Sequence, residues 1–306
     1  MTTESLHPQA RCGLVAIVGR ANVGKSTLLN AILGEKVSIV SPVAQTTRTL
    51  VRAILTEPRG QLVFLDTPGV HKASHDLGRT MNRVARDAIE GVDVVLLVLD
   101  ASEAPREEDA GWISRLVGSE TPCIALLNKA DRKPDRAAEF RELWGELAFE
   151  RKSNQAPEWI SASGLTGEGV PGLVDLLFRT VPEGPRLFPD DILTDYPRKL
   201  NIADVVREKY FAVLREELPH AMAVEIETVE EGEDGWRAAG SVLVDKASQK
   251  GIVLGGKGRL LKRVRQEAEK ELAEMYGRPV SLDLWVKVEK GWSRNYWMLR
   301  RLGYVR

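Results

Sequence analysis

The sequence predicts an α/β protein in which a doubly wound, mostly parallel sheet is followed by a smaller α+β domain. From residue 13 to about residue 181, short apolar segments alternate with helical patterns, which is typical of a doubly wound sheet. A stretch with three prolines and a glycine, residues 181–191, then interrupts this alternation. Beyond it the expected order is helix, two strands, glycine-rich turn, helix and strand, which indicates a second fold.

Six apolar segments account for the strands of the first domain. Two of them, 92–100 and 122–128, are apolar throughout, as expected of central parallel strands that are covered on both faces. The expected strands are 14–18, 50–55, 61–66, 92–100, 122–128 and 158–161. The expected helices are 77–90, 107–117, 136–149 and 170–180. In such a sheet, ligands bind at the carboxyl ends of the strands.

The second domain is built from fewer elements. Apolar residues at helical spacing predict a helix over 201–218, and the strands 223–229 and 236–244 are joined by a turn rich in glutamate and glycine. A charged helix at 259–276 and a strand at 280–289 complete the domain. The predicted divisions are an N-terminal tail (1–11), a first domain (12–182), a linker (183–200) and a second domain with a C-terminal tail (201–306).

The composition is that of a globular protein with an uneven distribution of charge. Hydrophobic residues make up 43% and charged residues 28% of the 306 residues, and no apolar run approaches the ~18 residues of a membrane-spanning helix. There is no secretory signal pattern, and Cys12 and Cys123 lack metal-ligand neighbours, so we expect a cytoplasmic protein with free thiols. Residues 251–306 carry 13 basic and 6 acidic side chains, which leaves 30 and 38 for the rest of the chain. The basic C-terminal part indicates a polyanionic partner.

The segment GRANVGKS, residues 19–26, predicts a polyphosphate site. It lies between an expected strand and an expected helix, where glycines let the backbone curve around an anion and present N–H groups to it. Lys25 would reach the outer phosphates, and the Ser26 hydroxyl would ligate Mg²⁺. A glycine turn with a solvated lysine is the alternative, but all four fixed positions of the motif are filled. The expected phosphate site is Gly19, Arg20, Ala21, Asn22, Val23, Gly24, Lys25, Ser26 and Thr27.

Two further segments would respond to the terminal phosphate. Asp66 begins DTPG directly after an expected strand, where it would hold Mg²⁺, and the Gly69 N–H would sense the γ-phosphate. The segment VAQTTRT would supply a threonine that ligates Mg²⁺ only in the triphosphate state, and we expect Thr47, with Thr46 as the alternative. The expected metal ligands are Ser26, Thr47 and Asp66, and the expected nucleotide contacts of DTPG and its neighbour are Asp66, Thr67, Pro68, Gly69 and Val70.

The segment NKAD, residues 128–131, predicts that the base is guanine. Asp131 would accept hydrogen bonds from two N–H groups of guanine, whereas adenine offers no such pair. Asn128 would brace the site, and the Lys129 stem would cover the base. Alone, the tetrapeptide could equally be a helix N-cap, but its place in the order of motifs favours base recognition. After the next expected strand, the segment SAS would direct N–H groups toward the guanine oxygen. The expected base contacts are therefore Asn128, Lys129, Ala130, Asp131, Ser161, Ala162 and Ser163.

The second domain contains GGKG, residues 255–258, before its basic helix. A loop of this kind lets a sugar–phosphate backbone approach closely, because a side chain at either outer glycine would block it. A helix-capping turn is the alternative, which the positive charge of the region disfavours. The expected RNA-binding residues are Ile252, Val253 and Leu254 as the floor of a groove for bases, and Gly255, Gly256, Lys257, Gly258, Arg259, Lys262 and Arg263. The later aromatic residues are expected to pack against the core: Trp285, Trp292, Tyr296, Trp297 and Tyr304.

The ordered set GRANVGKS, QTTR, DTPG, NKAD and SAS resembles GTPases of the translation-factor class, and QTTR and DTPGVHK are similar to the forms found in the Era family of bacterial ribosome-assembly GTPases. The glycine loop and its surrounding elements resemble a type II KH domain. This resemblance covers the chain from about residue 12 to its end. It implies a TrmE-Era-EngA-like P-loop NTPase fold with a KH type II domain, and Mg²⁺-dependent hydrolysis of GTP to GDP and phosphate. It also implies a GTP-timed factor that binds the single-stranded 3′ end of 16S ribosomal RNA during assembly of the small (30S) subunit.

One position departs from the Ras-type pattern. Val70 stands where many GTPases carry a glutamine that orients the attacking water, so we expect slow intrinsic hydrolysis. The resemblance implies two remedies, namely a potassium ion held with the help of Asn22, or order supplied by the ribosome. The residues expected to act in hydrolysis are Asn22, Lys25, Thr47, Asp66 and Gly69.

Three other functions stay open at this point. An ATP-dependent phosphotransferase is opposed by NKAD. A signalling GTPase whose basic C-terminal domain binds acidic membrane or another partner is disfavoured by the glycine loop. A binding module with an inactive nucleotide site would fit Val70. We expect a monomer that binds no DNA, with peripheral contact at the inner face of the cell membrane as a further expectation.

Overall fold

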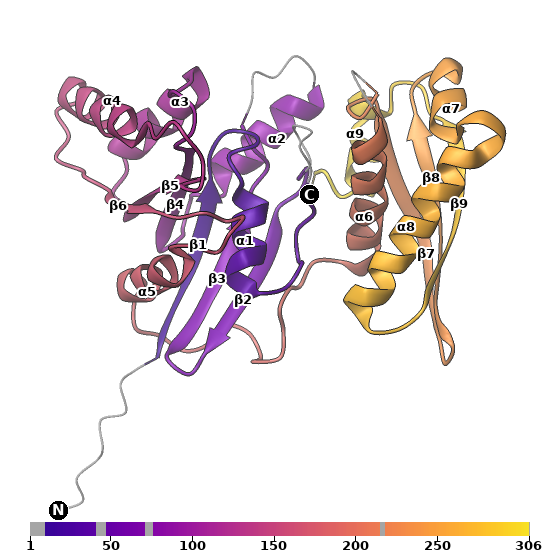
Figure 1. Cartoon of the computed structure of the whole chain (residues 1–306), viewed down its shortest axis with the longest axis horizontal. Coiled ribbons are helices and arrows are strands. Elements are labelled where there is room, and N and C mark those ends of the chain that lie inside the picture. Colours follow the sequence, from indigo (N-terminus) through magenta and orange to yellow (C-terminus); the bar gives the residue numbers. More distant parts are fainter. Residues whose placement is uncertain (1–9, 41–46, 71–75, 215–217, 306) are drawn as a thin grey trace, which may run out of the picture. The chain divides into compact units, whose positions relative to one another are not determined.

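The computed structural model describes residues 10–40, 47–70, 76–214 and 218–305. These residues form two compact units. The first comprises 10–38, 50–70 and 81–195, and the second comprises 39–40, 47–49, 76–80, 196–214 and 218–305. Thr46 and most of the predicted N-terminal tail lie outside the described residues. Figure 1 colours the elements of both units along the sequence.

The first unit contains a six-stranded sheet in the order β2-β3-β1-β4-β5-β6. All neighbouring strands pair in parallel except β2, which runs antiparallel to β3. Every residue of β4 and β5 is buried, as their uninterrupted apolar sequences predict. The strands are β1 (Arg11–Val18), β2 (Val51–Glu57), β3 (Gly60–Asp66), β4 (Val94–Asp100), β5 (Cys123–Asn128) and β6 (Glu158–Ser161). The predicted fold class is confirmed, and only the antiparallel β2 departs from a fully parallel sheet.

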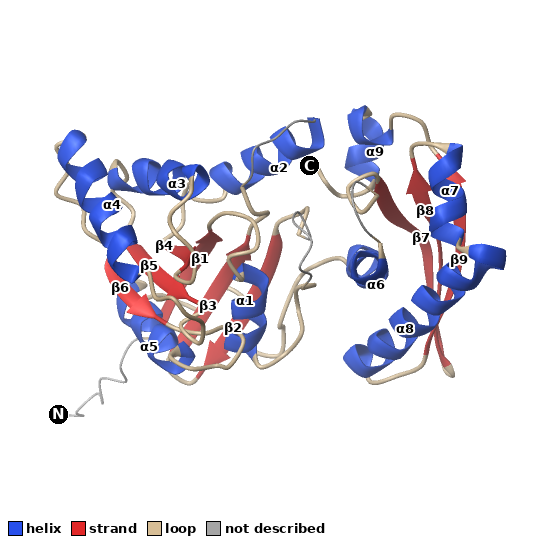
Figure 2. Ribbon diagram, turned by 45° about the horizontal axis from the view of Figure 1, so that its top comes forward, coloured by secondary structure: helices blue, strands red, loops and turns tan. Residues whose placement is uncertain are grey.

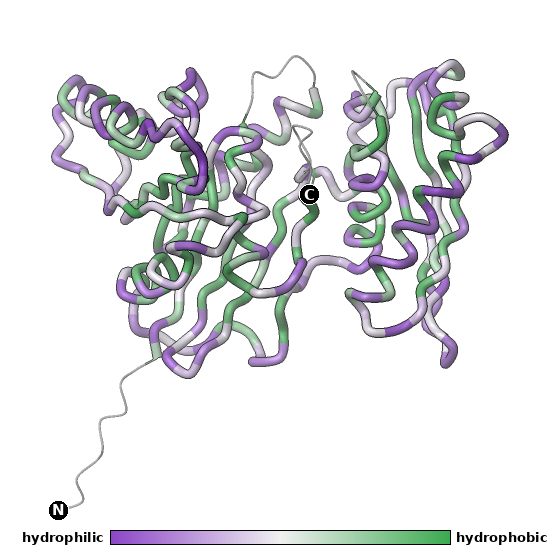
Figure 3. The backbone as a smooth tube through the Cα atoms, viewed as in Figure 1, coloured by the Kyte–Doolittle hydropathy of each residue, from purple (hydrophilic) through white to green (hydrophobic). Residues whose placement is uncertain are grey.

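Helices cover both faces of this sheet (Figure 2). On one face, α1 (Lys25–Leu33) packs beside α5 (Val170–Thr180). The other face is covered by α3 (Glu107–Val117), α4 (Ala137–Glu150) and the part of α2 (Asp76–Asp87) that belongs to this unit. Large side chains from these helices, among them Trp112 and Phe140, pack against β1, β4 and β5. Apolar residues accordingly concentrate in the strands and the inner sides of the helices (Figure 3).

The strand register brings the predicted motifs to one edge of the sheet. Asp66 at the end of β3 lies opposite Ile17 of β1, and the phosphate loop begins two residues later. Asp100 at the end of β4 lies opposite Asn128 at the end of β5. The carboxyl ends of four neighbouring strands therefore meet where the sequence places its nucleotide motifs.

The second unit is a three-stranded sheet in the order β7-β8-β9 with helices on one face (Figure 2). The hairpin β7 (Met222–Gly232) and β8 (Gly235–Val244) is antiparallel, and β9 (Val280–Val288) pairs with β8 in parallel. Its core contains side chains from the strands and from α6 (Arg198–Val213), α7 (Ala247–Leu254) and α8 (Arg259–Tyr276). Shorter elements are η1 (Gly256–Gly258), η2 (Trp292–Arg294) and α9 (Tyr296–Arg301). None of the helices in the described ranges is long and apolar enough to cross a bilayer.

Two expectations for this unit differ from the structure. No element was predicted for residues 247–254, but these residues form the helix α7, which buries Val253 in the core. Four of the five late aromatic residues divide into two groups, and the fifth, Trp285, is half-buried. Trp292 and Tyr304 are buried, as expected, whereas Tyr296 is 53% and Trp297 71% exposed, so the expectation is wrong for that pair. The short helix α9 turns only one side toward the core, and these two side chains lie on its other side.

Candidate nucleotide and RNA sites

The loop between β1 and α1 requires glycine at two positions for reasons of space as well as conformation. Gly19 has a φ of 147°, and a Cβ there would lie 2.4 Å from the carbonyl oxygen of Val98. Gly24 has a φ of 98°, and a Cβ there would lie 2.5 Å from Nδ2 of Asn128. Side chains at these positions would displace the strand ends that shape the site. The loop therefore curves closely over the carboxyl edge of the sheet.

Lys25 is the buried cation of this loop. Its side chain is 6% exposed, and Nζ donates hydrogen bonds to the carbonyl oxygens of Gly19 (3.1 Å) and Arg20 (2.9 Å). Burial lowers the pKa of Lys25 to about 8, although the nearby Asp66 carboxylate acts in the opposite direction. An ammonium group that is held by neutral carbonyls gains charge stabilisation from a phosphate oxygen. This position is therefore suited to an anion.

Asp66 lies beside two hydroxyl groups. Its Oδ2 accepts hydrogen bonds from Oγ of Ser26 (2.8 Å) and Oγ of Ser38 (3.0 Å). Its Oδ1 is buried and has no hydrogen-bond partner among the described residues, and burial raises the pKa of the carboxyl group. An unpaired carboxylate oxygen next to a serine hydroxyl offers the hard oxygen ligands that Mg²⁺ prefers. The residues present therefore fit the predicted ion, and Ser38 is an additional member that the sequence did not identify.

DTPG is fastened to the phosphate loop by backbone contacts. The Ala21 N–H donates to the carbonyl oxygen of Val70 (3.1 Å), and the Val70 N–H donates to the carbonyl oxygen of Gly19 (3.4 Å). Thr67 Oγ1 donates to the carbonyl oxygen of Ile17 (2.8 Å). Gly69 approaches so closely that a Cβ there would lie 2.6 Å from Cα of Ala21. The two motifs thus form one wall, and a side chain at position 69 would push them apart.

Asn128 joins the base motif to the phosphate loop. Its Nδ2 donates to the carbonyl oxygen of Val23 (2.7 Å), and its Oδ1 accepts from the N–H of Gly164 (3.0 Å). The side chain is 2% exposed, so both hydrogen bonds are protected from water. This geometry agrees with the bracing role that we predict for Asn128.

Asp131 and the SAS segment, which were also predicted to contact the base, differ in whether their polar groups are already hydrogen-bonded within the chain. Asp131 is exposed, and no described residue donates a hydrogen bond to its carboxylate, so this group is available to a ligand. In the SAS segment, the Ala162 N–H donates to the carbonyl oxygen of Leu127 (3.1 Å) and the Ser163 N–H donates to that of Glu168 (2.9 Å). These two N–H groups are paired within the chain, contrary to the expectation that they face a base. The pairing of β6 with β5 extends to Ala162, and the turn that follows occupies the N–H of Ser163.

The side chain of Arg20, a residue predicted in the phosphate site, is paired with acidic residues outside the phosphate loop. It is 5% exposed, and it donates to Asp109 (3.1 Å) and to Glu103 (2.8 Å). Burial raises the pKa of Asp109, and the arginine opposes that effect. Arg20 therefore anchors the phosphate loop to α3 and to the residues before it.

Asp100 extends this anchor to the base motif. Its Oδ2 lies 3.7 Å from Nη2 of Arg20 and 2.6 Å from Nζ of Lys129. Burial opposes ionisation of Asp100, but hydrogen bonds from Lys129 and Ser102 outweigh burial, and the pKa of Asp100 is lowered. Lys129 Nζ also donates to the carbonyl oxygen of Asn22 (2.8 Å). The sequence signal that could have found Asp100 is its position at the carboxyl end of an apolar strand.

In the second unit, the glycine loop joins α7 to α8. Gly255 has a φ of 71°, and a Cβ there would lie 2.6 Å from Cβ of Leu260. Lys257 and Gly258 also have positive φ values, 56° and 76°. Three of four residues therefore have positive φ, which directs the loop away from the helix axis and leaves Gly256 and Lys257 exposed. The loop has the open backbone that contact with a sugar–phosphate chain requires.

The residues around this loop do not share one environment. Ile252 is 56% exposed, whereas Val253 has no exposed surface and lies in the core, contrary to the expectation that it lines a groove for bases. Arg259 Nε donates to the carbonyl oxygen of Gly256 (3.1 Å), and Arg263 pairs with Glu267 (2.7 Å). Lys257, Arg259 and Lys262 are exposed and form no ion pair among the described residues.

Two family models match the chain. Residues 14–129 match a model described as 50S ribosome-binding GTPase, and residues 217–293 match one described as KH domain. A GTPase Era of Geobacter metallireducens is 42% identical over 297 residues, which cover 96% of this chain and 98% of the relative. A GTPase Era of Clostridium botulinum is 41% identical over 296 residues, with 96% and 98% covered. The chain belongs to the GTPase Era family.

Solved Era structures agree with this assignment over 97% of the chain. A substituted form of Aquifex aeolicus Era, bound to GDP.AlF4⁻, is 38% identical and covers 97% of this chain and 100% of its own, with a TM-score of 0.88. An Era in complex with MgGDPNP and nucleotides 1506–1542 of 16S ribosomal RNA has the same identity, coverage and TM-score. The resemblance that the sequence motifs indicate is confirmed, and so is the combination of a GTPase fold with a KH domain.

The Era family assignment gives particular interest to the QTTR segment. The described residues of the longer segment VAQTTRT, 47–49, belong to the second unit, although they stand between α1 and β2 in the sequence. Arg48 is 1% exposed and donates hydrogen bonds to the carbonyl oxygens of Met222 (2.8 Å) and Pro219 (3.0 Å). Thr49 Oγ1 lies 2.7 Å from the hydroxyl of Tyr196. Arg48 is thus a core residue of the KH unit, which the sequence did not reveal.

A buried polar network extends from this segment. Tyr196 donates to Asp204 (2.9 Å), which pairs with Arg207 (2.8 Å). Arg207 and Arg48 both donate to the hydroxyl of Tyr304, at 3.1 and 3.3 Å. In this Era-family chain, the predicted metal ligand Thr47 therefore adjoins a network that holds the second unit together.

Proposed function

We propose that this chain binds GTP and Mg²⁺ at the carboxyl edge of the first sheet and hydrolyses the γ-phosphate bond with water. The observation that carries the proposal is the backbone hydrogen bonding of DTPG to the phosphate loop. It places Asp66 beside Ser26 in a buried site, where Oδ1 of Asp66 has no hydrogen-bond partner among the described residues. Mg²⁺, when bound, supplies positive charge to the phosphate oxygens. Ser26 and Asp66 would hold the ion, with Thr47 joining them in the triphosphate state.

Lys25 and the N–H groups of residues 22–26 would stabilise the charge that develops on the transferred phosphoryl group. Gly69 would position its N–H beside the γ-phosphate, and Asp131 would accept the guanine N–H groups. Val70 has no group that could orient the water, so turnover would be slow until another factor orders the site. Asn22 is exposed at the rim of the loop and would help to hold a potassium ion there.

We propose that the second unit binds the single-stranded 3′ end of 16S ribosomal RNA during assembly of the small ribosomal subunit. The solved Era complex with nucleotides 1506–1542 supports this partner, because that structure and this chain agree over 97% of this chain. The open backbone at 255–258, with Lys257 and Lys262 exposed, supports a phosphate contact at the loop. The protein would act in the cytoplasm, with peripheral contact at the inner face of the cell membrane, which cell fractionation tests.

We propose that nucleotide state reaches the KH unit through residues 47–49. A threonine that ligates Mg²⁺ only in the triphosphate state must shift when the γ-phosphate leaves, and its neighbour Arg48 is fixed by buried hydrogen bonds to the KH unit. A shift of Thr47 would therefore alter the hydrogen bonds between its neighbour Arg48 and the KH unit. GTP would in this way time the release of RNA.

One experiment tests the function as a whole. RNA affinity is measured with an oligonucleotide of the 16S 3′ end for the empty, GDP-bound and GTP-analogue-bound protein, and GTP turnover is measured with and without small subunits. We expect nucleotide-dependent RNA affinity and faster turnover on the subunit. Equal affinity in all three states would refute the coupling, and an absence of turnover in both conditions would refute the hydrolytic function. The Arg48→Lys variant should bind GTP normally while RNA affinity depends less on the nucleotide.

A further inference from the structure

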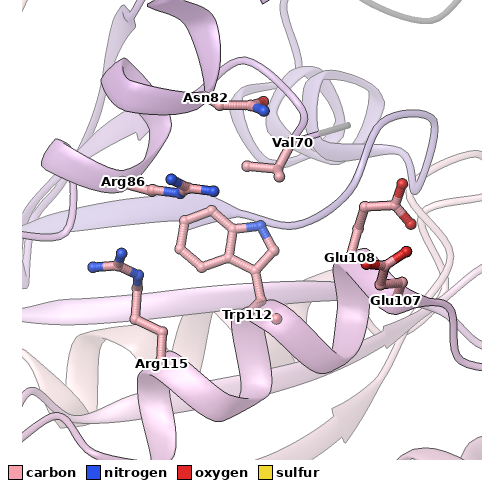
Figure 4. Close-up of a pocket in the computed structure, with 8 residues that line it drawn as sticks. Val70, Asn82, Arg86, Glu107, Glu108, Trp112 and Arg115 are labelled. Carbon is pink, nitrogen blue, oxygen red and sulfur yellow. The ribbon is translucent and has the colours of Figure 1, made fainter. Parts of the chain in front are cut away.

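A pocket of about 260 Å³ opens between α2 and α3 of the first unit, and Val70 forms part of its wall (Figure 4). Among the residues that line this pocket, Val70 is the one that directly follows the DTPG motif. The side chains that matter for its chemistry are Val70, Arg86, Glu107, Glu108, Trp112 and Arg115. A volume of this size accommodates one or two side chains of a partner, not a folded domain.

The pocket has two ends of opposite charge. Arg86 and Arg115 lie at one end, Glu107 and Glu108 lie at the other, and the indole of Trp112 lies between them (Figure 4). None of the four charged side chains forms an ion pair or a side-chain hydrogen bond within the described ranges. The guanidinium groups are therefore available to a carboxylate, and the carboxylates are available to a cation.

Trp112 provides a second and independent sign of a ligand. The side chain is 3% exposed, and its Nε1–H has no acceptor among the described residues. In Figure 4 the nitrogen-bearing edge of the indole points toward Val70. Buried indole N–H groups usually find a partner, because leaving one unpaired is costly. A partner segment that enters here can supply the missing acceptor with a backbone carbonyl.

We infer that this pocket is a docking site for a protein segment of the small ribosomal subunit, in which an acidic and a basic side chain stand a few residues apart. The acidic group would pair with Arg86 and Arg115, and the basic group would pair with Glu107 and Glu108. An RNA strand fits less well, because it brings phosphates to the glutamate end and no cation to compensate. The inference rests on the proposed function, since it takes the subunit as the source of the segment.

Occupation of the pocket would also act on hydrolysis. Val70 is held to the phosphate loop through backbone hydrogen bonds with Gly19 and Ala21. A side chain packed against Val70 would restrict its motion and keep DTPG closed on the loop. The partner would thereby supply part of the order that a glutamine supplies in other GTPases.

The test uses the full chain with a photoreactive phenylalanine in place of Gly111, an exposed pocket residue where a Cβ would meet no described atom within 4 Å. The protein is irradiated on purified small subunits with a GTP analogue, and the crosslinked peptide is sequenced. We expect a protein peptide with an acidic and a basic residue within about four positions. The double variant Arg86→Glu/Arg115→Glu should lower the yield at least about tenfold, as expected for loss of interfacial charge pairs.

The control is Arg83→Glu, an exposed arginine of α2 that does not line the pocket. It should leave the crosslink unchanged. Reversing the acidic residue of the captured peptide to lysine should restore the crosslink to the double variant, which a folding defect could not do. Crosslinks to RNA only, to a second copy of the chain, or to no molecule, with subunit binding intact, would overturn the inference and leave the proposed function standing. Failure to bind subunits would refute both.

Discussion

The Arg48 guanidinium donates a hydrogen bond to the hydroxyl of Tyr304, which stands 256 positions further along the chain (3.3 Å). The same hydroxyl accepts a hydrogen bond from Arg207 (3.1 Å). A residue of the QTTR motif and the last aromatic residue of the chain thus share one buried polar centre. The KH unit is complete only when it includes part of a motif that the sequence assigns to the nucleotide.

Removing the shared hydroxyl should destabilise the second unit. In Tyr304→Phe, two buried guanidinium groups lose an acceptor, and we expect the free energy of unfolding to fall by ~1–3 kcal/mol. Urea unfolding followed by circular dichroism measures this change. Trp297→Phe is the control, because Trp297 is exposed and the substitution should have almost no effect. Equal stability of the Tyr304→Phe variant and the parent would show that the centre does not depend on this hydroxyl.

GTP affinity should fall as the pH rises above about 8. Lys25 has a pKa of about 8 in the nucleotide-free protein because it is buried, and a triphosphate favours its charged form. Above that pH, binding must first protonate the lysine, and the Kd should rise by up to about tenfold per pH unit. Calorimetry between about pH 7 and 9, in buffers of different ionisation enthalpy, measures the proton uptake.

The matched control for this effect is Lys25→Arg, since a guanidinium does not titrate in the same range. Its Kd should lack the additional rise that Lys25 contributes. Lys25 also affects stability with a definite sign. Between its folded pKa of about 8 and its ordinary value of 10.5, the unfolded chain binds more protons, so the contribution of Lys25 to the free energy of unfolding rises with pH. A Kd that is flat with pH for the parent protein would contradict the buried ammonium.

Asp131→Ala should abolish preference for guanine. The variant loses two charge-assisted hydrogen bonds to the base, each worth ~1.5–3 kcal/mol, so GDP affinity should fall by at least about a hundredfold. ADP affinity should not change, because adenine has no N–H pair for this carboxylate. Competition of GDP and ADP for a fluorescent nucleotide measures both. Asp135→Ala is a suitable control, since Asp135 lies a few residues later and is also exposed.

Lys257→Glu should weaken RNA binding without changing the nucleotide site. The side chain is exposed in the glycine loop and has no ion pair in the described part of the chain. We expect about a tenfold rise in Kd at low salt, and a slope of log K against log salt that is smaller by about one. Lys152→Glu places the same charge change on an exposed lysine of the first unit. Equal losses in both variants would mean that net charge, not the loop, governs binding.

Potassium should accelerate hydrolysis more than sodium at equal concentration. A cation held with the help of Asn22 would offset phosphate charge where Val70 offers no polar group. Turnover in KCl and NaCl measures this effect, and Asn22→Asp should remove the difference between the salts. Identical rates in both salts, with the variant also silent, would leave the ribosome as the source of order.

The sequence predicted those elements and motifs whose structure is determined by the local residue pattern. The bounds of β6, α3, α5 and α8 coincide with the predicted segments, because the three helices have clear hydrophobic periodicity and each of the four elements lies close to a proline or a glycine. Motif order likewise placed Lys25, Asp66 and Asn128 at one edge of the sheet. These predictions depend on neighbours in sequence or on a strand register that parallel topology imposes.

The sequence did not predict contacts between residues that lie far apart along the chain. Nothing near Arg48 in the sequence indicates that it belongs to the core of the KH unit, since its partners lie more than 170 residues away. The anchoring of Arg20 by Asp109 depends in the same way on how α3 packs. The apolar residue Val253 was expected in a groove, but a short apolar run does not reveal which of its members faces the core.

Asn128 uses one amide to grip two loops, with its nitrogen on Val23 and its oxygen on the N–H of Gly164. The same side chain therefore supports the loop expected to hold the phosphates and the segment expected to hold the base. If Asp131, three residues later, reads the base, a base that fits poorly there would shift Asn128 as well. Such a shift would reach the opposite end of the nucleotide through this one amide.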